Sequence, residues 1–392
     1  MNMQFARRME QFGAGIFNVL DEKRREREAA GKKVYNLSIG TPDFSPAPHV
    51  MEALSQAARK PENYRYALSE RPELLEAVQN WYRRRYQVEL ARDEIMAVYG
   101  SQEGIAHIGW AICDPGDVVL VPDPGYPIFE MGPMLCGAKT VRYPLLPENH
   151  YLPDLSAIDP AVAREAKMMV VSYPMNPVSV AAPQSFYEEL VAFAQKYNIM
   201  ILHDNAYSEI VFDGREGRSF LAIPGAKEVG VEFNSLSKTY NLTGARISFV
   251  LGNRDMVQHF RTLRSQIDYG IFLPVQYAAI AALNGPQDSV ARNRAEYQAR
   301  RDALCGGLRS IGWNVPDSQG SMFVWAPLPK GYHNSVDFCF ELLERSGLLC
   351  TPGSAFGELG EGHVRFALVQ PVSMMQEIVA AVEASGMIDH EA

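Results

Sequence analysis

Short apolar runs alternate with amphipathic stretches from Ile95 to Leu251, and this alternation constrains the fold more than any other feature of the chain. The stretches Gln102–Cys113 and Phe186–Tyr197 have the spacing of helices, whereas the apolar runs are short enough for strands. We predict strands at Ile95–Tyr99, Asp117–Val121, Lys139–Tyr143, Met168–Ser172, Met200–Leu202, Val231–Asn234 and Ile247–Leu251. Strands that alternate with helices form a mostly parallel sheet covered on both faces, so we expect an α/β fold.

The pattern changes after Asn284-Gly285-Pro286, where a long polar helix is predicted from about Gln287 to Ile311. Strand-like segments then follow at Met322–Ala326 and Val364–Ala367, with a helix at Val336–Ser346. This mixture predicts a smaller α+β domain. We expect an N-terminal arm and part of the small domain at residues 1–45, a large domain at 46–285 and a C-terminal small domain at 286–392.

Charge and cysteine content exclude several classes of protein. The formal net charge of −9 argues against a nucleic-acid-binding surface. The five cysteines form no CxxC pair, so we expect neither a disulfide framework nor a metal site. No apolar run reaches the roughly 18 residues of a membrane span, and no apolar signal segment follows Arg7-Arg8. We therefore expect a cytoplasmic protein that does not bind membranes.

Polar side chains follow the predicted strands at the points where those strands end. Ligands of open α/β sheets bind beyond the carboxyl ends of the strands, so these side chains should share one crevice. In chain order they are Ser101, Gln102, Tyr126, Asn176, Asp204, Tyr207, Ser235, Ser237 and Lys238. Gly100-Ser101-Gln102 lies at the junction of a predicted strand and helix, and a helix N-terminus attracts anions such as phosphate. The plainer interpretation of Ser101 is a helix cap, and that of the other serines is a turn.

Lys238 is the residue whose chemistry matters most in this set. A lysine in a crevice forms an imine with an aldehyde when desolvation or a nearby cation keeps its amine neutral. Asp204 follows an apolar strand and needs a cationic partner, a role that a protonated pyridine nitrogen would fill. Arg246 could bind a phosphate and Arg365 a substrate carboxylate, although a surface ion pair and a buried structural ion pair are the plainer interpretations.

Together these segments resemble the fold type I, class I/II aminotransferases, from Gly40 to Arg365. The most specific motif is Ser235-Leu236-Ser237-Lys238 followed by Arg246, and Asp204-Asn205-Ala206-Tyr207 and Asn176-Pro177 precede it in the family's order. Narrower strings resemble the branch of LL-diaminopimelate and alanine aminotransferases. These strings are Gly100–His107, His203–Glu209 and Val275–Leu283.

The resemblance implies an enzyme of amino-acid biosynthesis that uses pyridoxal phosphate to move an amino group between an α-amino acid and a 2-oxo acid. Lys238 would bind the cofactor covalently and shuttle the proton. The other cofactor contacts would be Asp204 at the pyridine nitrogen, Tyr207 and Asn176 at the phenolic oxygen, Tyr126 on the ring, and Ser101, Gln102, Ser235, Ser237 and Arg246 at the phosphate. Arg365, Asn176 and the backbone of Gly40 would bind the substrate carboxylate. Tyr66 would reach the phosphate of the neighbouring subunit in a homodimer with shared active sites.

The chain departs from the family's pattern near the pocket entrance. Val178-Ser179 replaces the usual Thr-Gly, and Ala245 replaces the usual Trp or Gly before the arginine. Tyr64 lies close to Tyr66 in the sequence and is a second candidate for the contact assigned to Tyr66. The amino donor therefore stays open among LL-diaminopimelate, alanine and aspartate. Two other functions also stay open: a β-eliminating C–S lyase that uses the same cofactor, and a non-catalytic cofactor-binding regulator. The regulator is disfavoured because we expect no added DNA-binding domain.

Overall fold

Seven strands form the central sheet of the computed structural model, which describes residues 3–12 and 16–388. Across the sheet they are β2 (Ile95–Val98), β8 (Ser248–Gly252), β7 (Gly230–Ser235), β6 (Met200–Asp204), β5 (Ala166–Ser172), β3 (Val118–Asp123) and β4 (Lys139–Pro144). β8 is antiparallel to both of its neighbours, and the other six strands run parallel to one another. The predicted mostly parallel sheet is therefore confirmed, with strand ends that differ from the predicted ones by a few residues.

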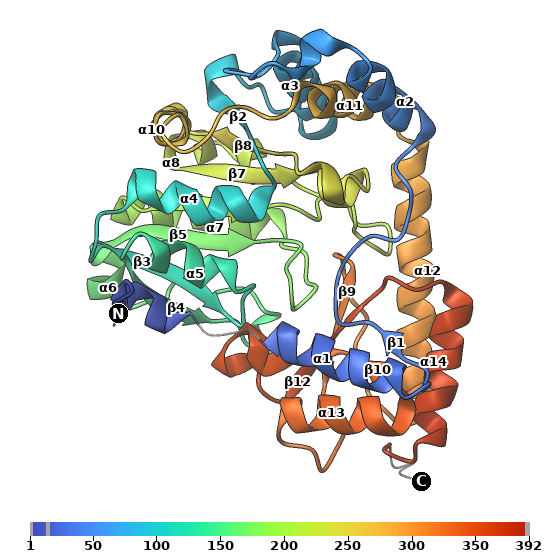
Figure 1. Cartoon of the computed structure of the whole chain (residues 1–392). Helices are drawn as coiled ribbons and strands as arrows, with labels where there is room; N and C mark the ends of the chain where they lie inside the picture. Colours follow the sequence, from blue (N-terminus) through green and yellow to red (C-terminus); the bar gives the residue numbers. More distant parts are fainter. Residues whose placement is uncertain (1–2, 13–15, 389–392) are drawn as a thin grey trace.

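Helices cover this sheet because its strands are apolar on both faces. All six residues of β7 are buried, as are six of the seven in β5. The helix α4 packs against both α5 and α10 (Figure 1). The helices that follow the sheet strands are α4 (Ser101–Ile112), α5 (Ile128–Leu135), α6 (Pro160–Glu165), α7 (Gln184–Tyr197), α8 (Ala226–Val229), α9 (Leu236–Thr239) and α10 (Arg254–Arg264).

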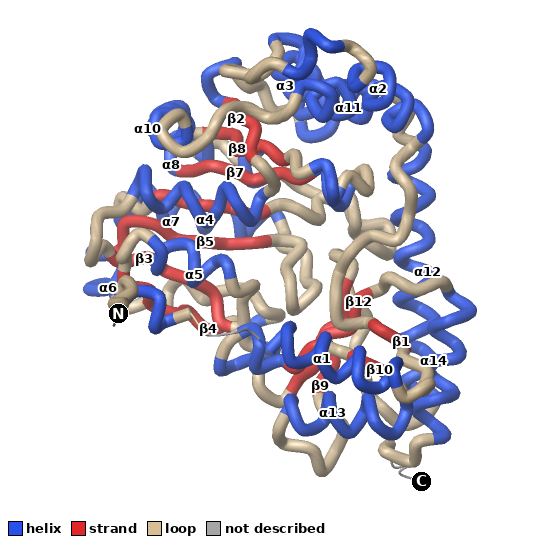
Figure 2. Tube along the Cα trace, in the orientation of Figure 1, coloured by secondary structure: helices blue, strands red, loops and turns tan. Residues whose placement is uncertain are grey.

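Two smaller sheets lie apart from the central sheet (Figure 2). The antiparallel one contains β11 (Thr351–Pro352), β12 (His363–Ala367) and β9 (Phe323–Pro327), and the parallel one pairs β1 (Tyr35–Asn36) with β10 (Leu348–Leu349). The helices here are α1 (Ile16–Ala29), α12 (Asp288–Ser310), α13 (Ser335–Ser346) and α14 (Val372–Ala384). A separate hydrophobic core forms around Trp313, Phe338 and Phe366. The pairing of β1 with β10 brings the N-terminal part of the chain into this region.

Three further helices form a layer at the β2 edge of the central sheet, at the top of Figure 1. They are α2 (Pro48–Ala58), α3 (Pro72–Tyr86) and α11 (Leu273–Asn284), and α11 packs against both of the others. A proline in the first turn starts each of them, a position where the missing N–H costs no helical hydrogen bond. Within the described residues, no helix has the length and apolar character that crossing a bilayer requires.

Candidate active site

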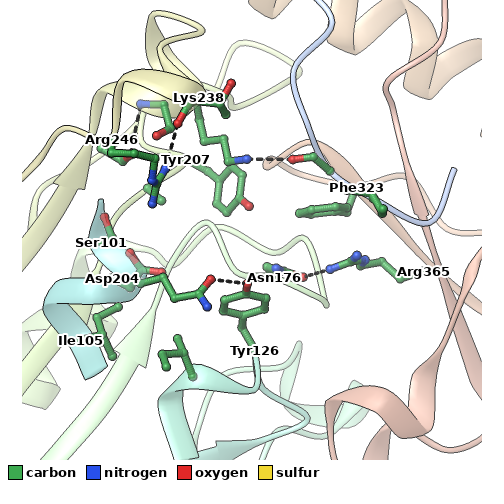
Figure 3. A pocket seen from close by; sticks show the side chains of 18 of the residues that line it. Ser101, Ile105, Tyr126, Asn176, Asp204, Tyr207, Lys238, Arg246, Phe323 and Arg365 are labelled. Atoms are coloured by element: carbon green, nitrogen blue, oxygen red, sulfur yellow. Dashed lines mark hydrogen bonds between the residues drawn. The ribbon is translucent and has the colours of Figure 1, made fainter. Parts of the chain in front are cut away.

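A cavity of about 380 Å³ lies beyond the carboxyl ends of the central strands, where they face the small antiparallel sheet (Figure 3). Every predicted site residue except Tyr66 lines it. These residues are Gly40, Ser101, Gln102, Tyr126, Asn176, Asp204, Tyr207, Ser235, Ser237, Lys238, Arg246 and Arg365. Ser101 and Arg246 lie on one side and Arg365 on the other, with Lys238 and Tyr207 between them (Figure 3). The strand ends thus converge as parallel topology requires.

Lys238 lies on the short helix α9, directly after β7, and its side chain enters the cavity. Its Nζ donates a hydrogen bond to the carbonyl oxygen of Gly40 at 2.8 Å. Burial lowers the pKa of this amine to about 8, and the positive charges of Arg365 and Arg246 lower it further than Asp204 raises it. The neutral, nucleophilic fraction of the amine near neutral pH is therefore far larger than that of an ordinary lysine.

Asp204 ends β6 with a buried carboxylate. Its Oδ1 has no hydrogen-bond partner among the described residues. Burial, together with the negative charge of Glu232, raises the pKa of this carboxyl to about 7. The preceding His203 instead contacts Glu232 at 3.0 Å in the protein interior, away from the cavity. Asp204 is thus available to bind a cationic or hydrogen-bond-donating ligand.

The helix α4 supplies an anion-binding end to the cavity. Gly100 precedes it with φ of +97°, a conformation that favours glycine, and a side chain there would collide with the guanidinium of Arg246. The hydroxyl of Ser101 is buried but has no hydrogen-bond partner within the described part of the chain. Together with the positive end of the α4 dipole, Ser101 and Arg246 can bind a phosphate.

Arg365 lies on β12 and is buried without a carboxylate partner in the described residues. Its Nη1 donates to Asn176 Oδ1 at 2.8 Å, and its Nη2 donates to the carbonyl oxygen of Ser38 at 2.9 Å. Its Cζ lies 4.0 Å from the ring centroid of Phe323 and 4.6 Å from that of Phe356. Burial lowers the pKa of Arg365 to about 10, so the guanidinium stays charged at neutral pH. An unpaired buried cation of this kind is a receptor for a carboxylate.

Tyrosine side chains complete the cavity wall. The hydroxyl of Tyr126 donates to Gln102 Oε1 at 2.8 Å, so the predicted phosphate contact Gln102 orients Tyr126 in this structure. The ring of Tyr207 packs edge-on against Phe323 at 5.9 Å. Burial raises the pKa values of both tyrosines, which therefore stay protonated and able to donate.

Sequence reasoning missed several residues of the wall. They are Ser38, Ile39, Ile105, Ile128, Ala206, Thr243 and Phe323. Phe323 belongs to an apolar strand and resembles an ordinary core residue in sequence. Its contact with the cavity shows only in the structure, where any side chain at Gly40 would collide with the ring of Phe323.

Tyr66 lies outside the cavity of its own chain. Its side chain is 77% exposed and its ring contacts Tyr269. The neighbouring candidate Tyr64 uses its hydroxyl within the chain, where it donates to the carbonyl oxygen of Ala58 at 2.8 Å. Tyr66 is thus the better placed of the two to reach another molecule.

Comparison with known proteins finds relatives over nearly the whole chain. Residues 32–382 match the sequence profile of the family "Aminotransferase class I and II". The LL-diaminopimelate aminotransferase of Moorella thermoacetica is 45% identical over 381 residues, which cover 96% of this chain and 97% of that protein. A probable N-succinyldiaminopimelate aminotransferase from Thermus thermophilus superposes with a TM-score of 0.89 at 34% identity, covering 94% of this chain and all of that one. A variant of the aspartate aminotransferase of the same organism gives 0.92 at 25% identity, covering 98% of this chain and all of that one.

Proposed function

The chain belongs to the class I and II aminotransferases, and we propose that it uses pyridoxal phosphate to transfer the amino group of LL-diaminopimelate to a 2-oxo acid. The predicted family and its LL-diaminopimelate branch are both confirmed by the relatives. The observation that carries the cofactor proposal is the arrangement in one cavity of an amine with a lowered pKa and a buried carboxylate oxygen without a partner.

The chemistry of the cavity matches the three functional ends of this cofactor. The unbonded Oδ1 of Asp204 would accept from the pyridine nitrogen. The α4 N-terminus, with the unbonded hydroxyl of Ser101 and with Arg246, Ser235 and Ser237, would hold the phosphate. Lys238 would then meet the aldehyde. Tyr207 and Asn176 would hold the phenolic oxygen, and Tyr126 would cover the ring.

Bound pyridoxal phosphate supplies an electron-accepting ring that stabilises negative charge at the substrate α-carbon. The negative charge of Asp204 would favour the protonated form of the ring nitrogen. The lowered pKa of the Lys238 amine would suit it to take a proton from that carbon and return it. Its hydrogen bond to the carbonyl oxygen of Gly40 shows that the side chain extends from α9 across the cavity.

Arg365 would bind the α-carboxylate common to the amino donor and the 2-oxo acid. Its guanidinium is already oriented by Asn176 and Ser38. Because it is already buried, substrate binding adds little desolvation cost. The choice of LL-diaminopimelate rests on the relatives, since proteins of that activity are 41–45% identical to this chain over nearly its whole length.

We also propose a homodimer in which Tyr66 contacts the cofactor phosphate of the partner subunit. An exposed apolar patch surrounds Tyr66, as expected of a subunit interface. It consists of Tyr64, Tyr66, Leu68, Ile267, Tyr269 and Phe272, and a β-bridge between Ala67 and Gly270 joins its two segments.

The test is a half-reaction screen of about twenty amino acids and LL-diaminopimelate, read by cofactor absorbance. We expect LL-diaminopimelate to convert the cofactor to its amino form and 2-oxoglutarate to restore it. Conversion by alanine or aspartate alone would overturn the proposed donor but leave the aminotransferase assignment intact. Cystathionine, assayed for pyruvate without an acceptor, checks for β-elimination.

A further inference from the structure

Two buried serines face each other in a backbone conformation that serine rarely adopts. Ser179 has φ of +58° and Ser321 has φ of +66°, and their side chains are almost fully buried. Their hydroxyl oxygens lie 3.0 Å apart. A left-handed non-glycine residue persists only where its surroundings hold it, and such residues concentrate at functional sites.

The two hydroxyls close a ring of hydrogen bonds around the backbone of Phe323. The Phe323 N–H donates to Ser321 Oγ at 3.3 Å. Ser179 Oγ lies 2.9 Å from the Phe323 carbonyl oxygen and 3.2 Å from that of Pro177, and we assign its proton to the nearer acceptor, Phe323. A hydroxyl has one proton, so Ser321 is left to donate to Ser179, and every donor in the ring is used. We call Ser179 and Ser321 the serine clamp.

The serine clamp joins two segments that both contact Arg365. Ser179 belongs to the loop after β5, which carries Asn176, the acceptor of the Arg365 Nη1 hydrogen bond. Ser321 lies just before β9, which carries the Phe323 ring over the Arg365 guanidinium (Figure 3). The carbonyl oxygen of Ser179 also accepts from the backbone N–H of Gln319 at 2.9 Å. The clamp therefore fixes the position of Asn176, at the edge of the guanidinium, relative to the Phe323 ring on its face.

We propose that Ser179 and Ser321 are positioning residues that set the orientation of Arg365 for the substrate α-carboxylate. The inference rests on the carboxylate-binding role proposed for Arg365. A bidentate contact with a planar guanidinium depends on its rotation, so a shift of Asn176 against Phe323 weakens carboxylate binding. Among the described residues, the proton-transferring Lys238 forms its hydrogen bond with Gly40 and not with the clamp, so we expect the chemical step to be unaffected.

The experiment replaces each serine by glycine in the cofactor-loaded enzyme. Glycine removes the hydroxyl and suits the left-handed backbone, so Ser179→Gly and Ser321→Gly should both fold. We expect KM for the amino donor and for 2-oxoglutarate to rise about tenfold, as for loss of a buried hydrogen bond, with kcat changed by less than about twofold. The double variant should show no further rise, because either change opens the same ring.

Two control variants separate the clamp from its surroundings. Gln87→Gly makes the same backbone change at another left-handed residue, at the end of α3, and should leave both KM values unchanged. Ser318→Ala removes a second donor to the Phe323 carbonyl but leaves the clamp closed, so its KM effect should be below about twofold. A second readout is the rise in melting temperature that glutarate causes, which should shrink in both clamp variants.

Unchanged KM values in the glycine variants, with or without a change in melting temperature, would overturn the positioning role. A fall in kcat at unchanged KM would overturn it as well. Arg365→Lys distinguishes this failure from failure of the proposed function. If Arg365→Lys raises KM strongly while the glycine variants match the wild type, only the clamp is refuted. If Arg365→Lys leaves KM unchanged, the carboxylate assignment itself is wrong.

Discussion

Replacing Asp204 by asparagine should stabilise the cofactor-free protein, although this residue is proposed to be essential in the loaded enzyme. Its pKa is raised from 3.8 to about 7, chiefly because the carboxylate is buried. That difference corresponds to about 4 kcal/mol of destabilisation when the group is ionised in the folded state. This difference compares the ionised with the protonated carboxyl, and an amide in the same place has a burial cost similar to that of the protonated carboxyl. Asp204→Asn should therefore raise the free energy of unfolding by about 4 kcal/mol at pH 8.

The pH dependence of this gain follows from the sign of the shift. Between about pH 4 and pH 7 the folded state holds a proton on Asp204 that the unfolded state has lost. The contribution of Asp204 to stability thus falls as pH rises through this window and is constant above it. The advantage of the variant should be small near pH 4 and reach its full size above pH 7.

Urea unfolding of the cofactor-free proteins at pH 5, 6, 7 and 8 measures this difference. Asp213→Asn is the matched control, because its hydrogen bond with Arg301 lowers the Asp213 pKa. That variant should lose stability at pH 8, the opposite sign. With pyridoxal phosphate bound, Asp204→Asn should be less stable than the wild type. An Asp204→Asn protein that is less stable than the wild type without cofactor at pH 8 would refute the reasoning.

Three further outcomes are expected. Cofactor-free protein should bind pyridoxal phosphate at a rate that rises with pH around a midpoint near 8, because the Lys238 amine has its pKa there. Stopped-flow absorbance measures this rate, and a midpoint near 10 would show that the amine is an ordinary lysine. Lys238→Ala should lose transamination while still folding, as measured by steady-state assay and circular dichroism. Tyr66→Phe should weaken cofactor affinity severalfold by loss of one hydrogen bond across the dimer, measured by equilibrium dialysis, with unchanged affinity arguing against that contact.

The polar side chains that line the cavity could be predicted from the sequence because the order and direction of the strands bring them together. Asp204 and Lys238 directly follow apolar strands, and parallel neighbours must place their carboxyl ends together. The strands β1 and β10 were not predicted. Each has two residues, and their pairing of Tyr35 with Leu348 joins segments far apart in the chain, so no local pattern indicates them.

Apolar parts of the site were harder to predict for a different physical reason. Phe323 has the composition and spacing of a core strand, and only its 4.0 Å distance to Arg365 gives it a role in the cavity. The missing carboxylate partner of Arg365 could not be predicted either. A buried arginine with such a partner and one without it look alike in sequence.

The replacement Val178-Ser179 was noted in the sequence as a departure that reshapes a loop. The hydroxyl of Ser179 has its hydrogen-bond partner in Ser321, 142 positions away in the chain. The effect of the replacement therefore depends on that second residue. Either serine alone would carry the strain of a left-handed backbone without the hydrogen-bond ring that offsets it. The two serines therefore make physical sense only as a pair, because Asn176 and Phe323 lie on separate segments and both contact one guanidinium.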